Sequence, residues 1–192
     1  MPGQYGAMPM AITDHHRELA GVARSFLQKH QAHDAARALL DAEVTGLPPF
    51  WADLVGLGWL GLHVSEEYGG AGYGLLELAI VVEEMGRVLA PGPFLPTVVA
   101  SALIEATGSP AQRQRWLPGL VDGSITAGIG LVGGPARLAD AGGSAHWPVV
   151  LGAETADLFV LAVGDDVVVA PVTPGCRWVP GPIWTTPADP SR

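Results

Sequence analysis

Apolar residues recur at helical spacing along the first two-thirds of the chain. From Ile12 onward, helical spacing of apolar residues predicts an amphipathic helix marked by Ile12, Leu19, Ala20, Ala23, Phe26 and Leu27. Thr13 or Asp14 is a suitable cap for its start. Further helices are predicted in DAARALLDAEV, in PPFWADLVGLGW, over 75–89, over 98–106 and in SPAQRQRWLPGL. In the last of these, Ser109, Pro110 and Gln112 form a capping box with proline at the first helical position.

The helix over 75–89 has the clearest pattern. One stripe is predicted to be buried, and it contains Leu75, Leu78, Ala79, Val82, Met85, Gly86 and Leu89. Glu77, Glu84 and Arg87 fall mostly elsewhere. Glu83 lies nearer the stripe and is a candidate to meet an arginine, whereas adjacent carboxylates such as Glu83 and Glu84 do not converge on one substrate atom.

Beyond Ile125 the pattern changes to short β-branched runs. The stretches ITAGIGLVG, HWPVVLGA, DLFVLAV and DVVVAPV are predicted strands, and a hairpin is predicted about Gly164, Asp165 and Asp166. Because strands follow helices without alternating with them, the fold class is predicted to be α+β. We expect an N-terminal all-helical bundle (1–124) followed by a small antiparallel β-barrel-like domain (125–192).

Charge and composition narrow the class of protein. The 192 residues carry a formal net charge of −9 and a single lysine, Lys29, which argues against nucleic acid as a partner. Charged residues make up only 15% of the chain, which favours a surface covered by another domain or chain. The single cysteine, Cys176, excludes an internal disulfide. We expect no membrane span and no signal peptide, and therefore a cytoplasmic location.

The residues alone reveal no catalytic constellation and no metal site. The glycine-rich stretch EEYGGAGYG could cradle a phosphate, but it lacks a preceding strand and G-x-G-x-x-G spacing, so a structural elbow is favoured. Adjacent His15 and His16 would point about 100° apart on a helix, so they cannot share a metal and are predicted to be surface residues.

Several blocks resemble one family in the same order. FWADLVGLGWLGLHVSEEYGGAGYGLLELAIVVEEMGRVLA resembles the N-terminal helical domain of the acyl-CoA dehydrogenases. TGSPAQRQRWLPGLVDGSITAGIGL is similar to the family's next helix and its entry to the middle β-domain, and ETADLFVLAV to a later strand. The resemblance covers roughly 13–184. It implies an oligomeric FAD-dependent oxidoreductase of lipid β-oxidation that converts acyl-CoA thioesters to enoyl-CoA by means of a glutamate base.

The resemblance also indicates where FAD would be contacted. Leu131, Val132 and Gly133 stand near the family's first flavin segment, and Val150 and Leu151 stand in its second, where a threonine usually donates a hydrogen bond. Leucine cannot donate such a bond, so we expect a degenerate FAD pocket.

The base belongs to a C-terminal helical domain that would begin near the end of this chain, so no catalytic residue is predicted here. We expect a flavoprotein fragment or subunit acting on acyl-CoA with a dehydrogenase partner or by self-association through Val81–Leu89 and neighbouring faces. The alternative is a non-catalytic pseudo-subunit that stabilises an active dehydrogenase.

Overall fold

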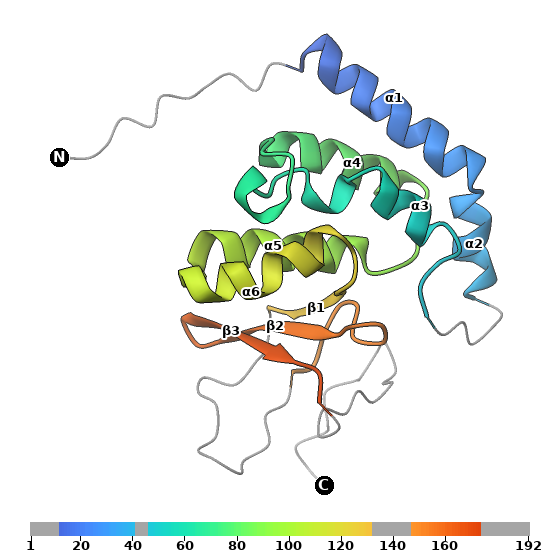
Figure 1. The fold of residues 1–192 in the computed structure, drawn as a ribbon. Helices are drawn as coiled ribbons and strands as arrows, with labels where there is room; N and C mark the ends of the chain where they lie inside the picture. Colours follow the sequence, from blue (N-terminus) through green and yellow to red (C-terminus); the bar gives the residue numbers. More distant parts are fainter. Residues whose placement is uncertain (1–11, 41–45, 132–146, 174–192) are drawn as a thin grey trace, which may run out of the picture.

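The computed structural model describes residues 12–40, 46–131 and 147–173 (Figure 1). These residues form helices, two short 3-10 turns (η) and three strands. In chain order they are α1 (Asp14–Lys29), α2 (Ala32–Ala38), α3 (Trp51–Gly56), η1 (Trp59–Gly61), η2 (Glu66–Tyr68), α4 (Leu75–Arg87), α5 (Phe94–Thr107), α6 (Pro110–Val121), β1 (Ala127–Gly130), β2 (Leu158–Val163) and β3 (Asp166–Pro171).

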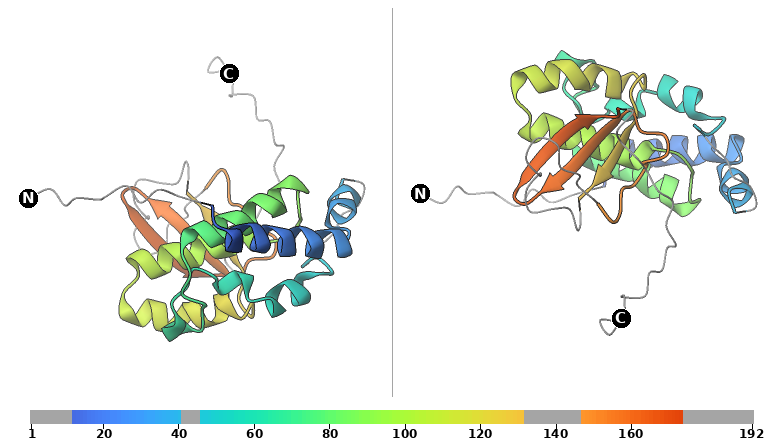
Figure 2. Two further views of the ribbon diagram at one scale, coloured as in Figure 1. Left: turned by 90° about the horizontal axis from the view of Figure 1, so that it is seen from above. Right: turned by 90° about the horizontal axis from the view of Figure 1, so that it is seen from below.

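The elements stack in layers, and this confirms the α+β class. In Figure 1, α1 lies over α3 and α4, the pair α5 and α6 lies beneath them, and the sheet packs under that pair. The two other views of Figure 2 keep the sheet on one side of α5 and α6. One apolar core fills the space among α1, α3 and α4, and it includes Leu27, Leu54, Trp59, Val81 and Val98. A second lies between α5, α6 and the sheet, and it includes Ile104, Leu117, Leu120, Leu158 and Val160.

Helix starts follow the predicted capping chemistry. The Thr13 hydroxyl accepts a hydrogen bond from the His16 backbone N–H at the start of α1. At the start of α6, Ser109 and Gln112 form the expected reciprocal capping box, with Pro110 at the first helical position. These local signals act within three residues, which is why the sequence alone locates them.

The buried stripe of α4 differs from the predicted one. Leu75 and Leu89 are 65% and 74% exposed, and Ala79 and Gly86 are also exposed. The buried residues of the helix are Leu78, Ile80, Val81, Glu84 and Met85. Within the predicted association surface Val81–Leu89, the residues Val81, Glu84 and Met85 are buried, whereas Glu83, Gly86, Arg87 and Leu89 are exposed. Association through this segment therefore stays a prediction that only its exposed residues could serve.

The glycine-rich stretch before α4 is the predicted elbow. Backbone N–H groups of Gly70, Ala71, Gly72 and Tyr73 donate to carbonyls of the segment 61–65 at 2.8–3.2 Å. At Gly70, a β-carbon would lie 1.9 Å from the carbonyl oxygen of Val64. These N–H groups therefore already have backbone acceptors and are not free to bind a phosphate.

The described sheet is mixed rather than antiparallel. β2 and β3 form the predicted antiparallel hairpin around Gly164, with Val160 opposite Val169. β1 instead pairs with β2 in parallel, with Ala127 opposite Leu158. The predicted strand HWPVVLGA is wrong over its described part, where the only ladder contact is one antiparallel bridge between Ile129 and Leu151. The order is β1-β2-β3, and a connection of 27 residues leaves room for the parallel crossover.

Candidate functional site

Three of the five residues predicted to contact FAD lie together at the end of β1. Leu131 directly follows the strand, and Leu151 exchanges backbone hydrogen bonds of 2.9 Å with Ile129 in both directions. Val150 lies against Gly130, since its Cγ2 is 3.3 Å from where a β-carbon on that glycine would stand. The other two, Val132 and Gly133, lie outside the described residues. The resemblance therefore picks out segments that are adjacent in space.

This edge of the sheet is apolar and half open. The exposed fractions of Leu131 and Leu151 are 42% and 48%, and that of Val149 is 58%. Side-chain donors nearby already have acceptors. The Trp147 indole N–H donates to the carbonyl of Ala162 at 2.9 Å. At the opposite end of β1, the Thr126 hydroxyl contacts both the Thr155 carbonyl and the Asp157 carboxylate.

A polar ladder on α5 joins the two cores. Thr97, Ser101 and Glu105 are four residues apart and so lie on one face of the helix. The Thr97 hydroxyl accepts from the Ala127 backbone N–H at the start of β1, at 3.1 Å. One turn on, Ser101 meets His63 at 3.1 Å, and Glu105 accepts from the Ser65 backbone N–H at 2.9 Å. The sequence signal was the i, i+4, i+8 spacing of polar residues inside an otherwise apolar helix.

His63 is the buried titratable group of this ladder. Because the Ser101 hydroxyl donates to the Val98 carbonyl at 3.0 Å, it accepts from His63 Nε2, which must carry the proton. His63 Nδ1 is buried and has no hydrogen-bond partner among the described residues. Burial lowers the pKa of His63, and the Glu105 carboxylate acts in the opposite direction.

This arrangement predicts an acid-sensitive fold. A lowered pKa means that the unfolded chain binds the His63 proton first, so its contribution to stability is complete above the unfolded pKa of about 6.5 and is lost as pH falls. We expect the difference in unfolding free energy between wild type and His63→Gln to shrink from pH 7.5 to pH 5, by at most about 1.4 kcal/mol per pH unit. Urea unfolding at each pH measures it. A difference that stays constant across this range would show that His63 titrates alike in both states.

His16 is buried, contrary to the prediction that it is a surface residue, whereas His15 is exposed. His16 Nδ1 accepts from the Thr13 backbone N–H at 3.0 Å, and Nε2 lies 3.1 Å from the carboxylate of Glu77 on α4. Glu77 also accepts from the Gly74 N–H at 3.0 Å. Its own backbone N–H, followed by His16 and Gly74, lowers the pKa of Glu77 against the opposing effect of burial. The pair is best explained as a clamp between α1 and α4.

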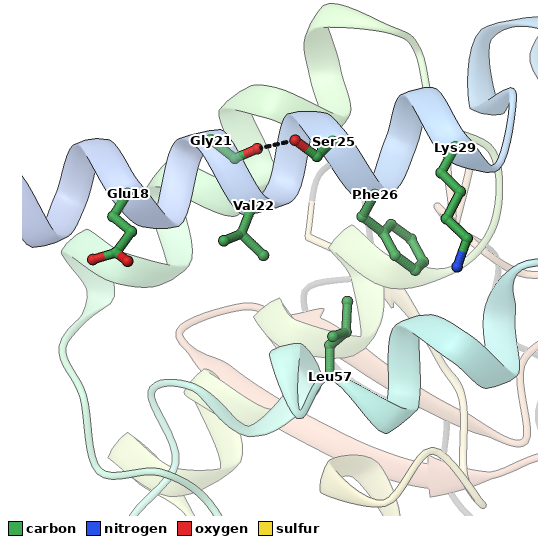
Figure 3. Close-up of a pocket in the computed structure, with 7 residues that line it drawn as sticks. All are labelled: Glu18, Gly21, Val22, Ser25, Phe26, Lys29 and Leu57. Atoms are coloured by element: carbon green, nitrogen blue, oxygen red, sulfur yellow. Dashed lines mark hydrogen bonds between the residues drawn. The ribbon is translucent and has the colours of Figure 1, made fainter.

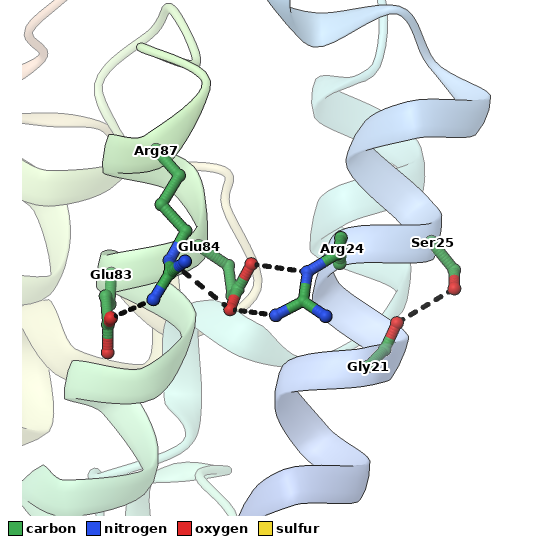
Figure 4. Close-up of polar contacts among 6 residues, drawn as sticks. All are labelled: Gly21, Arg24, Ser25, Glu83, Glu84 and Arg87. Carbon is green, nitrogen blue, oxygen red and sulfur yellow. Dashed lines mark hydrogen bonds and ion pairs between the residues drawn. The ribbon is translucent and has the colours of Figure 1, made fainter.

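A second clamp joins the same two helices (Figure 4). Glu84 is 5% exposed and accepts two hydrogen bonds from Arg24, at 2.7 and 3.1 Å. Arg87 lies 3.6 Å from Glu84 and 2.5 Å from Glu83, which raises the pKa of Arg87. Glu83 thus meets an arginine as predicted, but it is exposed, and the carboxylate that is drawn into the interface is Glu84.

An open depression lies between α1 and the end of α3 (Figure 3). Its volume is about 590 Å³, and its walls are mostly apolar carbon. In Figure 3, Val22 of α1 points toward Leu57, which follows α3. These two side chains are 48% and 44% exposed. Its lining residues are Glu18, Gly21, Val22, Ser25, Phe26, Lys29 and Leu57. The depression holds none of the residues predicted from the resemblance.

A metal centre and a membrane span are both missing from residues 12–40, 46–131 and 147–173. These residues include no group of three or more His, Cys, Asp or Glu side chains that could hold a metal ion. None of their helices is long and apolar enough to cross a membrane.

The helical layers and the small sheet define an α+β protein, and comparison with known proteins identifies its family. The model of the acyl-CoA dehydrogenase N-terminal domain matches residues 13–124. The chain belongs to the acyl-CoA dehydrogenase family. A curated relative, the acyl-CoA dehydrogenase FadE12 of Mycobacterium tuberculosis, is 41% identical over 101 residues, which are 50% of this chain and 24% of FadE12.

Solved structures agree in fold. A variant of the steroid ACAD Tcur3481-Tcur3483 matches with a TM-score of 0.64 and 31% identity over 80% of this chain and 45% of that one. The ChsE4-ChsE5 complex of Mycobacterium tuberculosis matches with a TM-score of 0.68 and 26% identity, over 86% and 48%. An acyl-CoA dehydrogenase from Bacillus anthracis that matches with a TM-score of 0.61 and 23% identity, over 84% and 31%, was solved with FAD. This chain thus spans less than half the length of these relatives.

The described edge of the sheet does not fit a flavin held by side chains. FAD is the cofactor that the family implies, and its ring requires hydrogen-bond donors. Leu131, Val150 and Leu151 have none to offer in their side chains. The Leu151 N–H is taken by Ile129, and the Trp147 indole N–H is taken by Ala162. The described side chains at this edge therefore supply no hydrogen bond to a flavin ring.

Proposed function

We propose that this chain is an acyl-CoA dehydrogenase-like fragment or subunit that works with a further domain or partner chain. Its role would lie in α,β-dehydrogenation of acyl-CoA thioesters, in fatty-acid or sterol side-chain β-oxidation, in the cytoplasm. Residues 1–124 would form the helical domain and 125–192 the middle β-domain. The observation that carries this proposal is the match of 13–124 to the family's N-terminal domain.

The residues at the sheet edge indicate which groups this chain would contribute and which the partner would contribute. Proton abstraction requires a positioned base within hydrogen-bond reach of the substrate, and the family's glutamate belongs to its C-terminal helical domain. We infer that the partner supplies this base together with most FAD contacts, and that this chain supplies the helical layers and the apolar edge at Leu131 and Leu151. Support for a partner comes from ChsE4-ChsE5, which was solved as a complex of two proteins.

A non-catalytic pseudo-subunit is the alternative, and the apolar edge favours it. Here the chain would stabilise an active dehydrogenase and contribute no group to the reaction. The two proposals differ in what the partner can do alone. A partner that is fully active alone and only gains thermal stability indicates a pseudo-subunit, whereas a partner that needs this chain for turnover indicates a catalytic assembly.

We expect the purified chain to oxidise no acyl-CoA and to retain no stoichiometric FAD. Dye-linked acyl-CoA oxidation and the visible absorbance of flavin measure the two properties, alone and after co-expression with a dehydrogenase chain that carries the helical domain with the base. Leu151→Thr restores a donor and should strengthen FAD retention in the assembly, whereas Val149→Thr serves as the matched control. Turnover by the isolated chain that a point change within it abolishes would refute the proposal.

A further inference from the structure

The segment 61–65, which connects η1 to η2, contains a buried histidine and also supports the elbow before α4. Its backbone carbonyls at positions 61, 62 and 64 accept the N–H groups of residues 71–73 at 2.8–2.9 Å. His63 lies between these acceptors in the sequence. A change in the position of His63 therefore displaces the carbonyl groups that hold the elbow.

The His63 ring has one paired nitrogen and one unpaired nitrogen. Its Nε2–H donates to the hydroxyl of Ser101 on α5, across 3.1 Å. Its Nδ1 is buried and has no hydrogen-bond partner among the described residues. A proton added at Nδ1 would create a buried donor without an acceptor, which costs free energy. The protonated ring is therefore poorly accommodated in its present position.

Glu105 supplies an acceptor of opposite charge one helical turn beyond Ser101, on the same face of α5. Its carboxylate already lies beside the segment 61–65, because its Oε1 accepts the Ser65 backbone N–H at 2.9 Å. The other charged groups on the elements packed around this segment are Asp53 on α3, Glu66 and Glu67 on η2, and Arg113 and Arg115 on α6. Burial lowers the pKa of His63, and among these charges the Glu105 carboxylate is the one that opposes it.

We propose that His63 is a proton-driven switch with two positions, built into the support of the elbow. Neutral His63 donates to Ser101, as the described structure shows. Protonated His63 leaves Ser101 and pairs with the Glu105 carboxylate, which displaces the segment 61–65 and loosens the hydrogen bonds to residues 70–73. Acidification thus alters the entry of the chain into α4. The switch does not depend on the dehydrogenase assignment, because neither the base nor FAD takes part.

Nuclear magnetic resonance of the full chain follows the ring and the elbow together. From pH 7.5 to pH 5, the His63 ring signals and the backbone amide signals of Ser65, Ala71 and Gly72 should shift with one common midpoint. This midpoint should lie below about pH 6.5, because burial lowers the pKa of His63. Elbow amides that stay in place while the ring titrates overturn the proposal. His33→Gln removes an exposed histidine of α2 and should leave the transition unchanged.

Ser101→Ala distinguishes a switch from a ring that titrates without moving. If the protonated ring has left Ser101, alanine destabilises the neutral form alone and raises the midpoint by about half a pH unit. A ring that stays bonded to Ser101 when charged loses a charge-assisted hydrogen bond instead, so its midpoint falls. A raised midpoint supports the switch, and a lowered or unchanged midpoint overturns it.

Two further variants test the other groups of the switch. Glu105→Gln keeps an oxygen acceptor for the Ser65 N–H but removes the charge, so the midpoint should move to lower pH. His63→Gln has no ring to titrate and should hold the elbow amides constant between pH 7.5 and pH 5. An unchanged midpoint in the first variant, or a persistent elbow shift in the second, assigns the transition to other groups and overturns the proposal.

Discussion

Replacing Gly70 by alanine is expected to destabilise the protein by about 3 kcal/mol or more. A β-carbon at this position would lie 1.9 Å from the Val64 carbonyl oxygen and 2.4 Å from its carbon. Both are backbone atoms of a buried segment, so neither can move without displacing the chain around it. The Gly70 N–H also donates to the Ser65 carbonyl at 3.2 Å, which ties the elbow to the same segment. Urea unfolding measures the loss.

Gly72 provides the matched control within the same elbow. Its φ of 66° is in the left-handed region, but a β-carbon there would meet nothing closer than the Glu66 side chain at 3.7 Å. Alanine at this position costs only the backbone strain, about 1–2 kcal/mol. Gly70 needs space, whereas Gly72 needs conformational freedom. If Gly70→Ala costs no more than Gly72→Ala, the close approach to Val64 is not what holds the elbow.

Sequence reasoning succeeded where structure depends on near neighbours. The amphipathic spacing of α1, the Ser109–Gln112 capping box and the hairpin around Gly164 all depend on residues a few positions apart. The interactions that form these elements act between residues a few positions apart, so the sequence pattern alone predicts them. The resemblance added contacts of longer range, since it pointed to Leu131 and Leu151, which the fold brings to one edge of the sheet.

The wrong predictions share a different cause, which is contact between residues that are far apart in the sequence. Glu84 and His16 are polar residues that were predicted to face away from the core, yet each is buried against a partner about sixty positions away in the sequence. Nothing in helical periodicity reports such a partner. The prediction of an antiparallel sheet is wrong for β1 because its partner β2 is also distant in the sequence, and the two strands pair in parallel across a connection of 27 residues. The depression beside α1 was not predicted, because helical spacing does not show that Val22 lies beside Leu57, which is distant in the sequence.

Loss of the Arg24–Glu84 ion pair is the second change that is expected to lower the free energy of unfolding strongly. Arg24→Met should destabilise the protein by about 2–3 kcal/mol, because it leaves the buried Glu84 carboxylate with Arg87 alone, at 3.6 Å. This is below the full cost of an orphaned buried charge, since the Arg24 side chain is 53% exposed and water can replace part of it. Arg87→Met is the control. It removes an exposed pair with Glu83, whose side chain is 62% exposed, and the longer 3.6 Å contact with Glu84. Glu84 keeps both hydrogen bonds from Arg24, so the change should cost less than about 1 kcal/mol.

A double-mutant cycle tests whether the loss comes from the stranded carboxylate. Replacing both partners, as Arg24→Met/Glu84→Leu, removes the buried charge together with its counterion and should recover most of the stability lost in Arg24→Met. Urea unfolding at pH 7 of wild type, Arg24→Met, Glu84→Leu and the double variant gives the coupling energy. Strictly additive losses would show that Arg24 and Glu84 act independently. Coupling of the expected sign would establish that Arg24 stabilises the packing of α1 on α4 by neutralising the buried Glu84 carboxylate.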